Sequence, residues 1–421
     1  MTKISRTTDM TQGSEMRHII MFSLPLLAGN LLQQTYNIVD TMVVGRYLGD
    51  DALAAVGATG SITYLFYTLC IGLSVGAGII VAQYFGAGKK KALRSAVFNS
   101  ALVTAIFGIV ISLLSVPAAR PILELLKVPD KLIGDSVAYM QIACGGTIAV
   151  AAYNWINAIM RALGDSKTPL IFLGAASLLN ALLDLLFVVV FKFGIAGAAW
   201  ATVLTQALSA ISCIVYCFAV SGEIKLTADD LHADKDMMSR CVKTGVPIAI
   251  QNGLISVSMV ALQRVTNGFG ETVMAAYTVS MRIEQFVQQP FSSLNAAVST
   301  FTGQNIGAGK EKRAQKGLAC AIKISVIFSA VVLVLFTLFG GAITSWFVKG
   351  KTVISISAKA LIITSLFYWS LGIIHTTRGF LNGAGDTNYA LVNGMAEVIC
   401  RIGLSPVSYT HLRAHETSQD L

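Results

Sequence analysis

Long apolar runs recur along the whole chain and constrain its fold more than any other feature. Each run of roughly 18 to 28 residues is long enough to cross a hydrocarbon layer about 30 Å thick as a helix. Hydrophobic residues make up 54% of the 421 positions and charged residues only 13%, about half the charged share of an ordinary soluble domain. The runs are too long and too evenly apolar for the alternating strands of an outer-membrane barrel. We therefore expect an all-α integral membrane protein.

We expect eleven membrane spans. The first run follows a polar segment and lacks a small-residue cleavage site, so we interpret it as a retained span. If the N-terminus is cytoplasmic, the inside segments carry eighteen Lys and Arg residues and the outside segments carry nine. This bias favours a cytoplasmic N-terminus. The spans are expected near residues 18–44, 52–84, 95–118, 132–158, 168–191, 195–220, 242–265, 272–302, 317–347, 353–377 and 388–405.

Two loops are nearly identical and indicate an internal repeat. The segment AQYFGAGKKKALR begins at Ala82 and GQNIGAGKEKRAQ begins at Gly303, which places their GAGK motifs 221 residues apart. The same offset pairs the GD of residues 164–165 with that of residues 385–386. Matches at one fixed spacing predict a tandem duplication. We expect two parallel six-helix repeats with a binding cavity between them near mid-depth.

The repeat predicts an N-terminal lobe over residues 1–221 (helices 1 to 6) and a C-terminal lobe over residues 222–405 (helices 7 to 11). A plan of two six-helix halves requires twelve helices, but the apolar pattern stops where the twelfth should begin. Residues 406–421 are polar and resemble a translated sequencing adapter, so we interpret them as a non-native tail. The twelfth helix is therefore expected to be lost or replaced in this chain.

The GAGK loops and the net charge of +9 suggest phosphate or nucleic acid, but the sequence argues against both. A GxxxxGK[ST] loop needs a first glycine where this chain has Gln83 and Gln304, and Lys90 and Glu311 occupy the hydroxyl position. We interpret the loops as tight glycine turns followed by positive charge that keeps them in the cytoplasm. We expect no nucleic-acid partner and no enzymatic activity.

Polar residues inside the apolar runs are the strongest candidates for a functional site. An ionised carboxylate at the centre of a membrane helix costs about 2.5 to 3.5 kcal/mol, so it should face the protein interior or be neutralised. Asp40 lies in the first span, Asn180 and Asp184 share one face of the fifth, and Thr202 lies in the sixth. These oxygen donors suit Na⁺ or a proton, and not zinc or copper. The alternative is a structural role, in which the carboxylates bond to polar neighbours on other helices.

The other intramembrane charges favour structural roles. Glu397 and Arg401 lie four residues apart on one helical face and are expected to neutralise each other. Arg282 and Glu284 point to different faces and need other partners. We expect His375, close to the end of its span, to lie at the membrane interface.

The motifs YNIVDTMVVGRYLG, GQNIGAGK, RALGDSKTP, NGAGDT and NALLDLLFVV together resemble the multidrug and toxic compound extrusion (MATE) family, within the multidrug/oligosaccharidyl-lipid/polysaccharide flippase superfamily. The resemblance covers nearly the whole chain, to about Ser405. It implies a multi-pass transporter of the prokaryotic plasma (inner) membrane that works as a monomer on small molecules. One branch of this family lacks an acidic pair in the C-terminal half, and its cation coupling is assigned to the N-terminal lobe. This chain resembles that branch, and the corresponding residues are Asp40, Asn180, Asp184 and Thr202. The implied coupling ion is H⁺ or Na⁺, with Na⁺ held at these four residues, and no other cofactor is implied.

The resemblance implies antiport, in which a cation moves inward while amphipathic, often cationic organic compounds move outward by alternating access. The candidate cavity residues are Gln34, Asn157, Gln251, Asn252 and Gln288. The alternative function is a flippase for lipid-linked oligosaccharides or cell-wall precursors. Its cavity should carry several inward basic residues for a pyrophosphate, whereas the N-terminal half of this chain offers acids.

Overall fold

The structure is a computed structural model and describes residues 7–220, 224–227, 230–266 and 270–401. These ranges contain helices and connecting loops and no strand, which confirms the expected all-α fold. The helices are α1 (Glu15–Leu48), α2 (Asp50–Gly86), α3 (Lys90–Leu125), α4 (Asp130–Gly145), α5 (Thr147–Ala162), α6 (Lys167–Asp184), η1 (Leu185–Val190), α7 (Gly194–Val220), α8 (Lys235–Thr266), α9 (Glu271–Gly307), α10 (Glu311–Ser345), α11 (Lys351–Ser365), α12 (Tyr368–Ala384) and a helix over 387–401.

Several of these helices are long and apolar enough to cross a membrane. Five in the described part of the chain meet this condition, or seven if each bent pair counts as one span. The bent pairs are α4 with α5, at 43°, and α11 with α12, at 51°. Eleven spans were expected from the sequence. Membrane crossing by α1, α8, α9 and the helix over 387–401 stays a prediction, because the first three are more polar and the last is short.

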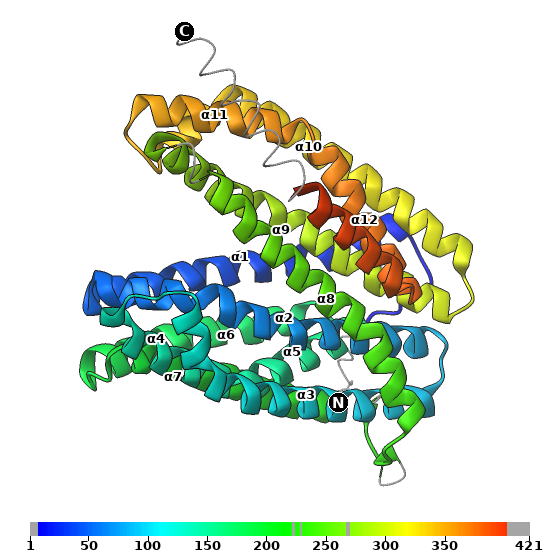
Figure 1. Cartoon of the computed structure of the whole chain (residues 1–421). Coiled ribbons are helices and arrows are strands. Elements are labelled where there is room, and N and C mark those ends of the chain that lie inside the picture. The colour runs from blue at the N-terminus through cyan, green and yellow to red at the C-terminus, as the bar shows by residue number, and fades with distance from the viewer. Residues whose placement is uncertain (1–6, 221–223, 228–229, 267–269, 402–421) are drawn as a thin grey trace.

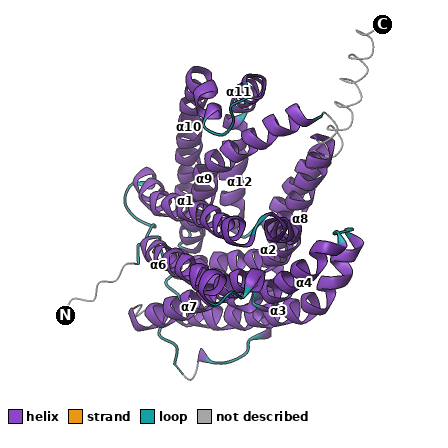
Figure 2. Ribbon diagram, turned by 90° about the vertical axis from the view of Figure 1, so that its left-hand side faces the viewer, coloured by secondary structure: helices purple, strands orange, loops and turns teal. Residues whose placement is uncertain are grey.

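The helices form two bundles that meet along α1, α2, α8 and α9. α2 packs against α8 and α9, and α1 packs against α9 and α10. The bundles lie close together where α2 and α9 end and diverge toward the opposite end (Figure 1). Seen from the side, α1, α2 and α8 lie between α9 to α12 and the remaining helices (Figure 2). The long helices α1 and α2 therefore carry most of the contact between the halves.

The repeated GD motif forms the same turn in each half. Gly164 and Gly385 follow α5 and α12 with φ values of +80° and +94°, a conformation that glycine adopts without strain. The Asp165 carboxylate then accepts the backbone N–H groups of residues 167 and 168 at 3.1 and 2.9 Å. Asp386 accepts the N–H of residue 389 at 3.3 Å. In each half the glycine ends one helix, and the aspartate accepts N–H groups in the first turn of the next helix.

The GAGK motifs also form matching turns. Gly88 and Gly309 have φ values of +66° and +71°. The next N–H group bonds back to the carbonyl five residues earlier, at 3.2 Å for Lys89 and 2.8 Å for Lys310, as in a Schellman helix end. The prediction of tight glycine turns is confirmed. We call this end of the molecule, which holds residues 86–89 and 307–310, the GAGK end.

The first glycines of the two motifs allow the halves to touch. A Cβ atom on Gly86 would lie 1.9 Å from the carbonyl oxygen of Gln304, and one on Gly307 would lie 1.9 Å from that of Gln83. Both distances are far inside van der Waals contact, so only glycine fits either position. The backbones of α2 and α9 therefore meet directly at the GAGK end.

Two glutamine side chains add reciprocal hydrogen bonds at this contact. Gln83 donates through Nε2 to the carbonyl of Gly383 at 3.0 Å, and Gln304 donates to the carbonyl of Ala162 at 2.9 Å. The donors are 221 residues apart, and so are the acceptors. Each glutamine thus binds a free carbonyl in the last turn of a helix of the other half.

The GLSVG segment of α2 forms a second close helix contact. A Cβ atom on Gly72 would lie 2.4 Å from backbone atoms of Ala249, and one on Gly76 would lie 2.6 Å from those of Gly245. Small residues four positions apart let two membrane helices approach closely. The segment is therefore a packing contact between α2 and α8.

Residues 8–15, which we call the N-terminal strap, lie across the GAGK end and reach both halves. The Thr8 N–H donates to the carbonyl of Leu163 in the N-terminal half at 3.2 Å. The Met10 N–H donates to Oε1 of Gln304 in the C-terminal half at 2.9 Å. The Met10 side chain is buried in a cluster that contains Phe301. The strap therefore joins the ends of α5 and α9.

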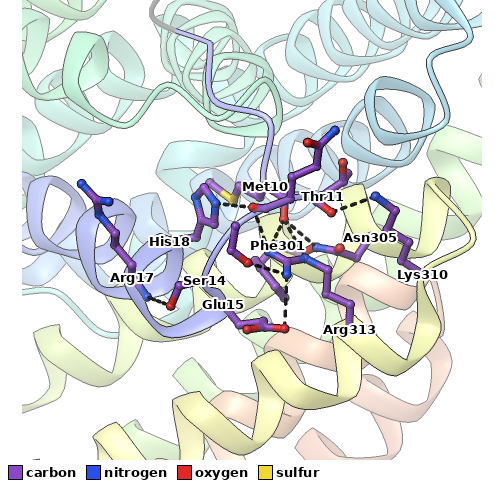
Figure 3. Close-up of polar contacts among 12 residues, drawn as sticks. Met10, Thr11, Ser14, Glu15, Arg17, His18, Phe301, Asn305, Lys310 and Arg313 are labelled. Atoms are coloured by element: carbon purple, nitrogen blue, oxygen red, sulfur yellow. Dashed lines mark hydrogen bonds and ion pairs between the residues drawn. The ribbon is translucent and has the colours of Figure 1, made fainter.

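Arg313 of α10 holds the strap from the C-terminal half (Figure 3). Its guanidinium donates to the carbonyls of Met10, Gln12 and Gly13, at 3.2, 3.0 and 2.7 Å. It also pairs with the Glu15 carboxylate at 3.2 Å. One side chain thus binds three strap carbonyls, of which those of Met10 and Gln12 also bond to Asn305 and His18.

The predicted non-native tail, residues 406–421, lies outside the described residues, and so does the region of the missing twelfth helix. The division of the chain into lobes at residue 221 stays a prediction.

Candidate functional site

Asp40 of α1 and Asp184 of α6 meet inside the N-terminal bundle. The two helices pack against each other, and the two carboxyl groups lie within hydrogen-bonding reach of one another. Asp184 is fully buried and Asp40 is half-buried. Both oxygens of Asp184 and Oδ1 of Asp40 lack a protein hydrogen-bond donor in the described part of the chain. Facing carboxyls without donors can share a proton or bind a cation.

The other two predicted coupling residues lie beside this pair. Asn180 lies one turn before Asp184 on the same face of α6, is buried, and has neither amide atom paired among the described groups. Thr202 of α7 lies near the hydroxyl of Tyr36 and interacts with it. Tyr36 lies one turn before Asp40 and interacts electrostatically with both carboxyls. The structure thus brings together the four residues that the sequence singled out.

Two tyrosines at this site escaped the sequence reasoning. Tyr36 could have been found, because it precedes Asp40 by four residues and shares its helical face. Tyr139 of α4 packs beside Val44 and Val188 and interacts electrostatically with Asp40 and Asp184. No spacing along the chain links residue 139 to the other helices, so only the fold could reveal it.

The helix that carries Asp184 changes its winding immediately after this residue. α6 ends at Asp184 and continues as the π-helix η1, Leu185–Val190. π-helical turns are rare and occur mostly at functional sites, because they shift the direction of side chains and loosen the regular backbone bonds. The wider turn therefore lies directly at the carboxyl pair.

A cavity of about 160 Å³ lies in the N-terminal bundle, on the side of the carboxyl pair toward the GAGK end. Its walls come from α1, α5 and α6 and include Pro25, Gln33, Tyr153, Asn157 and Arg161. Pro25 removes a backbone donor from α1 and is a natural point of bending. Polar groups of three helices thus line a space next to the helix that carries Asp40.

The five predicted cavity residues do not line one common space. Asn157 borders the N-terminal cavity, and Gln251 and Asn252 border a cavity of about 280 Å³ between the halves. Gln288 borders a third cavity, of about 380 Å³, in the C-terminal half. Gln34 is half-buried and borders none of these three spaces. Their role in binding substrate stays a prediction.

The charges of the C-terminal half are partly paired, as expected. Glu397 binds Arg401 at 2.6 Å, which confirms the predicted pair, and it also binds Arg378 at 3.2 Å. Glu284 faces the C-terminal cavity, whereas Arg282 is exposed. His375 borders the cavity between the halves, and its ring stacks on that of Phe291 with the centroids 6.2 Å apart. Its place at the membrane interface stays a prediction.

Two helical bundles with membrane-length helices, a buried carboxyl pair and a polar cavity between the halves define the class as a membrane transporter. A sequence model of the MatE family matches residues 25–186 and 247–407. The chain therefore belongs to the MatE family, and it is a transporter and not an enzyme.

Relatives and a solved structure agree with this assignment. The chain is 31% identical to the probable multidrug resistance protein YoeA of Bacillus subtilis (strain 168) over 393 residues, which cover 92% of this chain and 85% of YoeA. It is 29% identical to the probable multidrug resistance protein YpnP of the same strain over 386 residues, 91% of this chain and 86% of YpnP. The outward-facing structure of a multidrug resistance MATE family transporter matches with a TM-score of 0.88 at 22% identity, covering 95% of this chain and 90% of that one.

Proposed function

We propose that this chain exports amphipathic, often cationic organic compounds in exchange for an inward-moving H⁺ or Na⁺. The carboxyl pair of Asp40 and Asp184 carries the proposal, because two facing carboxyls without protein donors are unstable unless a cation or proton joins them. The printed names of YoeA and YpnP, both probable multidrug resistance proteins, support the substrate class.

α1 provides the physical link between cation binding and substrate movement. Its second half carries Asp40, and its first half contacts the C-terminal half, where Asn30 donates to the hydroxyl of Ser293 at 3.0 Å. Pro25 lies inside the helix near this contact. A cation that draws Asp40 toward Asp184 changes how α1 packs near Pro25, and this change alters its fit against α9.

The contacts at the GAGK end hold one state of an alternating-access cycle. The bundles meet there through α2, α9 and the N-terminal strap and diverge at the opposite end (Figure 1). With the GAGK end in the cytoplasm of a prokaryotic inner membrane, this arrangement faces outward. Cation binding favours this state, in which substrate is released outside, because each state must be favoured by a different ligand for transport to have a direction.

The membrane potential can drive such an exchange without ATP. One elementary charge that moves inward gains about 2.3 kcal/mol per 100 mV. Na⁺ finds oxygen donors in the side chains of Asp40, Asn180, Asp184 and Thr202, and a proton needs only the two carboxyls. A single chain holds the complete pair and both halves, so a monomer is sufficient.

Ethidium efflux from everted membrane vesicles tests the proposal. We expect Asp40→Asn and Asp184→Asn each to lower efflux by about tenfold or more at equal protein level, because neither variant retains the facing carboxyls that respond to the cation. Asp51→Asn is the matched control, since Asp51 is exposed and pairs with Lys131 at 2.6 Å away from the site. Wild-type efflux by either site variant would rule out the scheme.

A further inference from the structure

A polar passage inside the N-terminal bundle leads from the carboxyl pair toward the GAGK end. Tyr36, which interacts electrostatically with both carboxyls, borders a small space of about 10 Å³ among α1, α5, α6 and α7. This is about the room that one water molecule needs. The small space shares the wall residues Gln33, Tyr153 and Leu173 with the N-terminal cavity of about 160 Å³. That cavity extends to Ser166, in the turn between α5 and α6 at the GAGK end.

Polar atoms along this passage lack protein partners. Oγ1 of Thr205 and Oε1 of Gln206 belong to residues that border the small space, and neither atom has a hydrogen-bond partner among the described residues. Such oxygens accept hydrogen bonds from water and coordinate hard cations. The passage is therefore suited to a proton or a small cation that moves between the carboxyl pair and the GAGK end.

A positive charge stands in this passage. Arg161, in the last turn of α5, is the only charged residue in the described lining of the N-terminal cavity and the small space. Its guanidinium makes no hydrogen bond or ion pair with the described part of the chain. Arg161 also borders the cavity between the halves. A cation that moves toward the GAGK end through either cavity therefore meets this charge.

The position of Arg161 has two physical consequences. A cation in the last turn of a helix is favourable because it faces the negative end of the helix dipole, and this effect stabilises α5. The same charge repels any cation that passes it, and the repulsion is strong in a protein-lined space of low dielectric constant. An arginine that lines a pore excludes cations and protons in this way.

We propose that Arg161 is a charge barrier that closes the cytoplasmic side of the cation site while the GAGK end is closed. This inference rests on the proposed function and adds a residue that keeps cation entry tied to substrate export. A cation held by Asp40 and Asp184 does not cross to the cytoplasm alone, because it would have to pass the guanidinium. When the GAGK end opens, water reaches Arg161 and screens its charge, so the cation is released in that state.

Cation leak through the purified full chain in proteoliposomes, measured without any organic substrate, tests the inference. A K⁺ diffusion potential set with valinomycin, negative inside, drives cations inward. A trapped pH-sensitive dye reports H⁺ flux, and radiolabelled Na⁺ reports Na⁺ flux. We expect Arg161→Gln to raise the flux of one of these cations about tenfold over the wild type, because the repelling charge is gone. Arg161→Lys keeps the charge and should leak no more than the wild type.

Two further variants separate a leak through the cation site from a general defect. Arg378→Gln removes the other arginine that borders the cavity between the halves, but Arg378 borders neither the N-terminal cavity nor the small space. Its flux should match that of the wild type. Asp40→Asn added to Arg161→Gln should remove the extra flux, because the leak passes through the carboxyl pair. Arg161→Met keeps the apolar stem without the charge and gives the same test if Arg161→Gln fails to fold.

The inference is overturned if the neutral variants of Arg161 leak no more than the wild type, or if Arg161→Lys leaks as much as Arg161→Gln. It is also overturned if Arg378→Gln leaks to the same extent, or if the added Asp40→Asn leaves the extra flux intact. Ethidium efflux by the single variant Asp40→Asn is measured separately. Loss of this efflux without a leak in Arg161→Gln refutes only the present inference. Wild-type efflux by Asp40→Asn, together with a leak that depends on Asp40, refutes only the proposed function.

Discussion

At the scale of single residues, the free-energy cost of inserting polar side chains into a membrane is what singled out the candidate coupling residues. A polar side chain inside a membrane helix costs free energy unless it has a partner or a function. This cost pointed to Asp40, Asn180, Asp184 and Thr202. Their proximity in space follows from helix packing and could not be derived from the sequence, where positions 40 and 184 are unrelated by any repeat. At the 221-residue offset, the residue of the second half that corresponds to Asp40 is Ala261. The carboxyl pair therefore belongs to one half only.

Glycine spacing was equally informative, and Gly86 gives a direct test of the contact between the halves. Gly86→Val places side-chain atoms against the backbone of Gln304, so we expect a loss of about 1 to 3 kcal/mol in the free energy of unfolding, as for other overpacked sites. Gly57→Val is the matched control, because Gly57 lies in the same helix with nothing within 4 Å of its Cβ position. Thermal unfolding of the detergent-purified chain measures the difference. Equal melting temperatures for the two variants would show that α2 and α9 do not touch there.

At the scale of helices and turns, the sequence predicted the turns well and irregular helices poorly. The GD and GAGK motifs contain the glycine and cap residues that end one helix and begin the next, so their turns follow from local chemistry. The π-helix after Asp184 has no such signal, because LLFVVV suits an ordinary apolar helix equally well. The bends between α4 and α5 and between α11 and α12 could not be predicted from the sequence either, because the residues of each pair form one continuous apolar run.

The N-terminal strap is an element whose role depends on partners about 300 residues away, and it was invisible in the sequence. We expect Arg313→Gln to loosen the GAGK end, because three strap carbonyls each lose one donor and Glu15 loses its ion pair. Spin labels at the exposed positions 91 and 316, with the exposed Cys400 replaced by Ser, should report a longer and broader distance distribution.

Lys312→Gln is the control for this experiment, since Lys312 is an exposed neighbour of the same charge. It should leave the distance distribution unchanged. A distribution for Arg313→Gln that matches the wild type would show that the strap does not hold the two halves together.

At the scale of the whole molecule, the 221-residue offset predicted more than a similarity of motifs. Gln83 and Gln304, together with their acceptors Gly383 and Ala162, show that corresponding residues of the two halves make corresponding contacts across the interface. The offset could not predict that Arg161 and Arg378 both border the cavity between the halves, because the two arginines are not 221 residues apart. The N-terminal half was expected to offer acids, and Asp40 and Asp184 lie together there, although Arg161 of the same half borders the cavity next to them.

The central claim is that the carboxyl pair couples substrate movement to an inward cation. The most direct test is ethidium transport by the purified chain in proteoliposomes, with Na⁺ and proton gradients imposed separately. The wild type should accumulate ethidium against its own gradient when one of the two cation gradients is present. Asp184→Asn should still let ethidium equilibrate down its gradient but should fail to accumulate it, and Asp51→Asn should behave like the wild type. Uphill accumulation by Asp184→Asn at the wild-type rate would contradict the account.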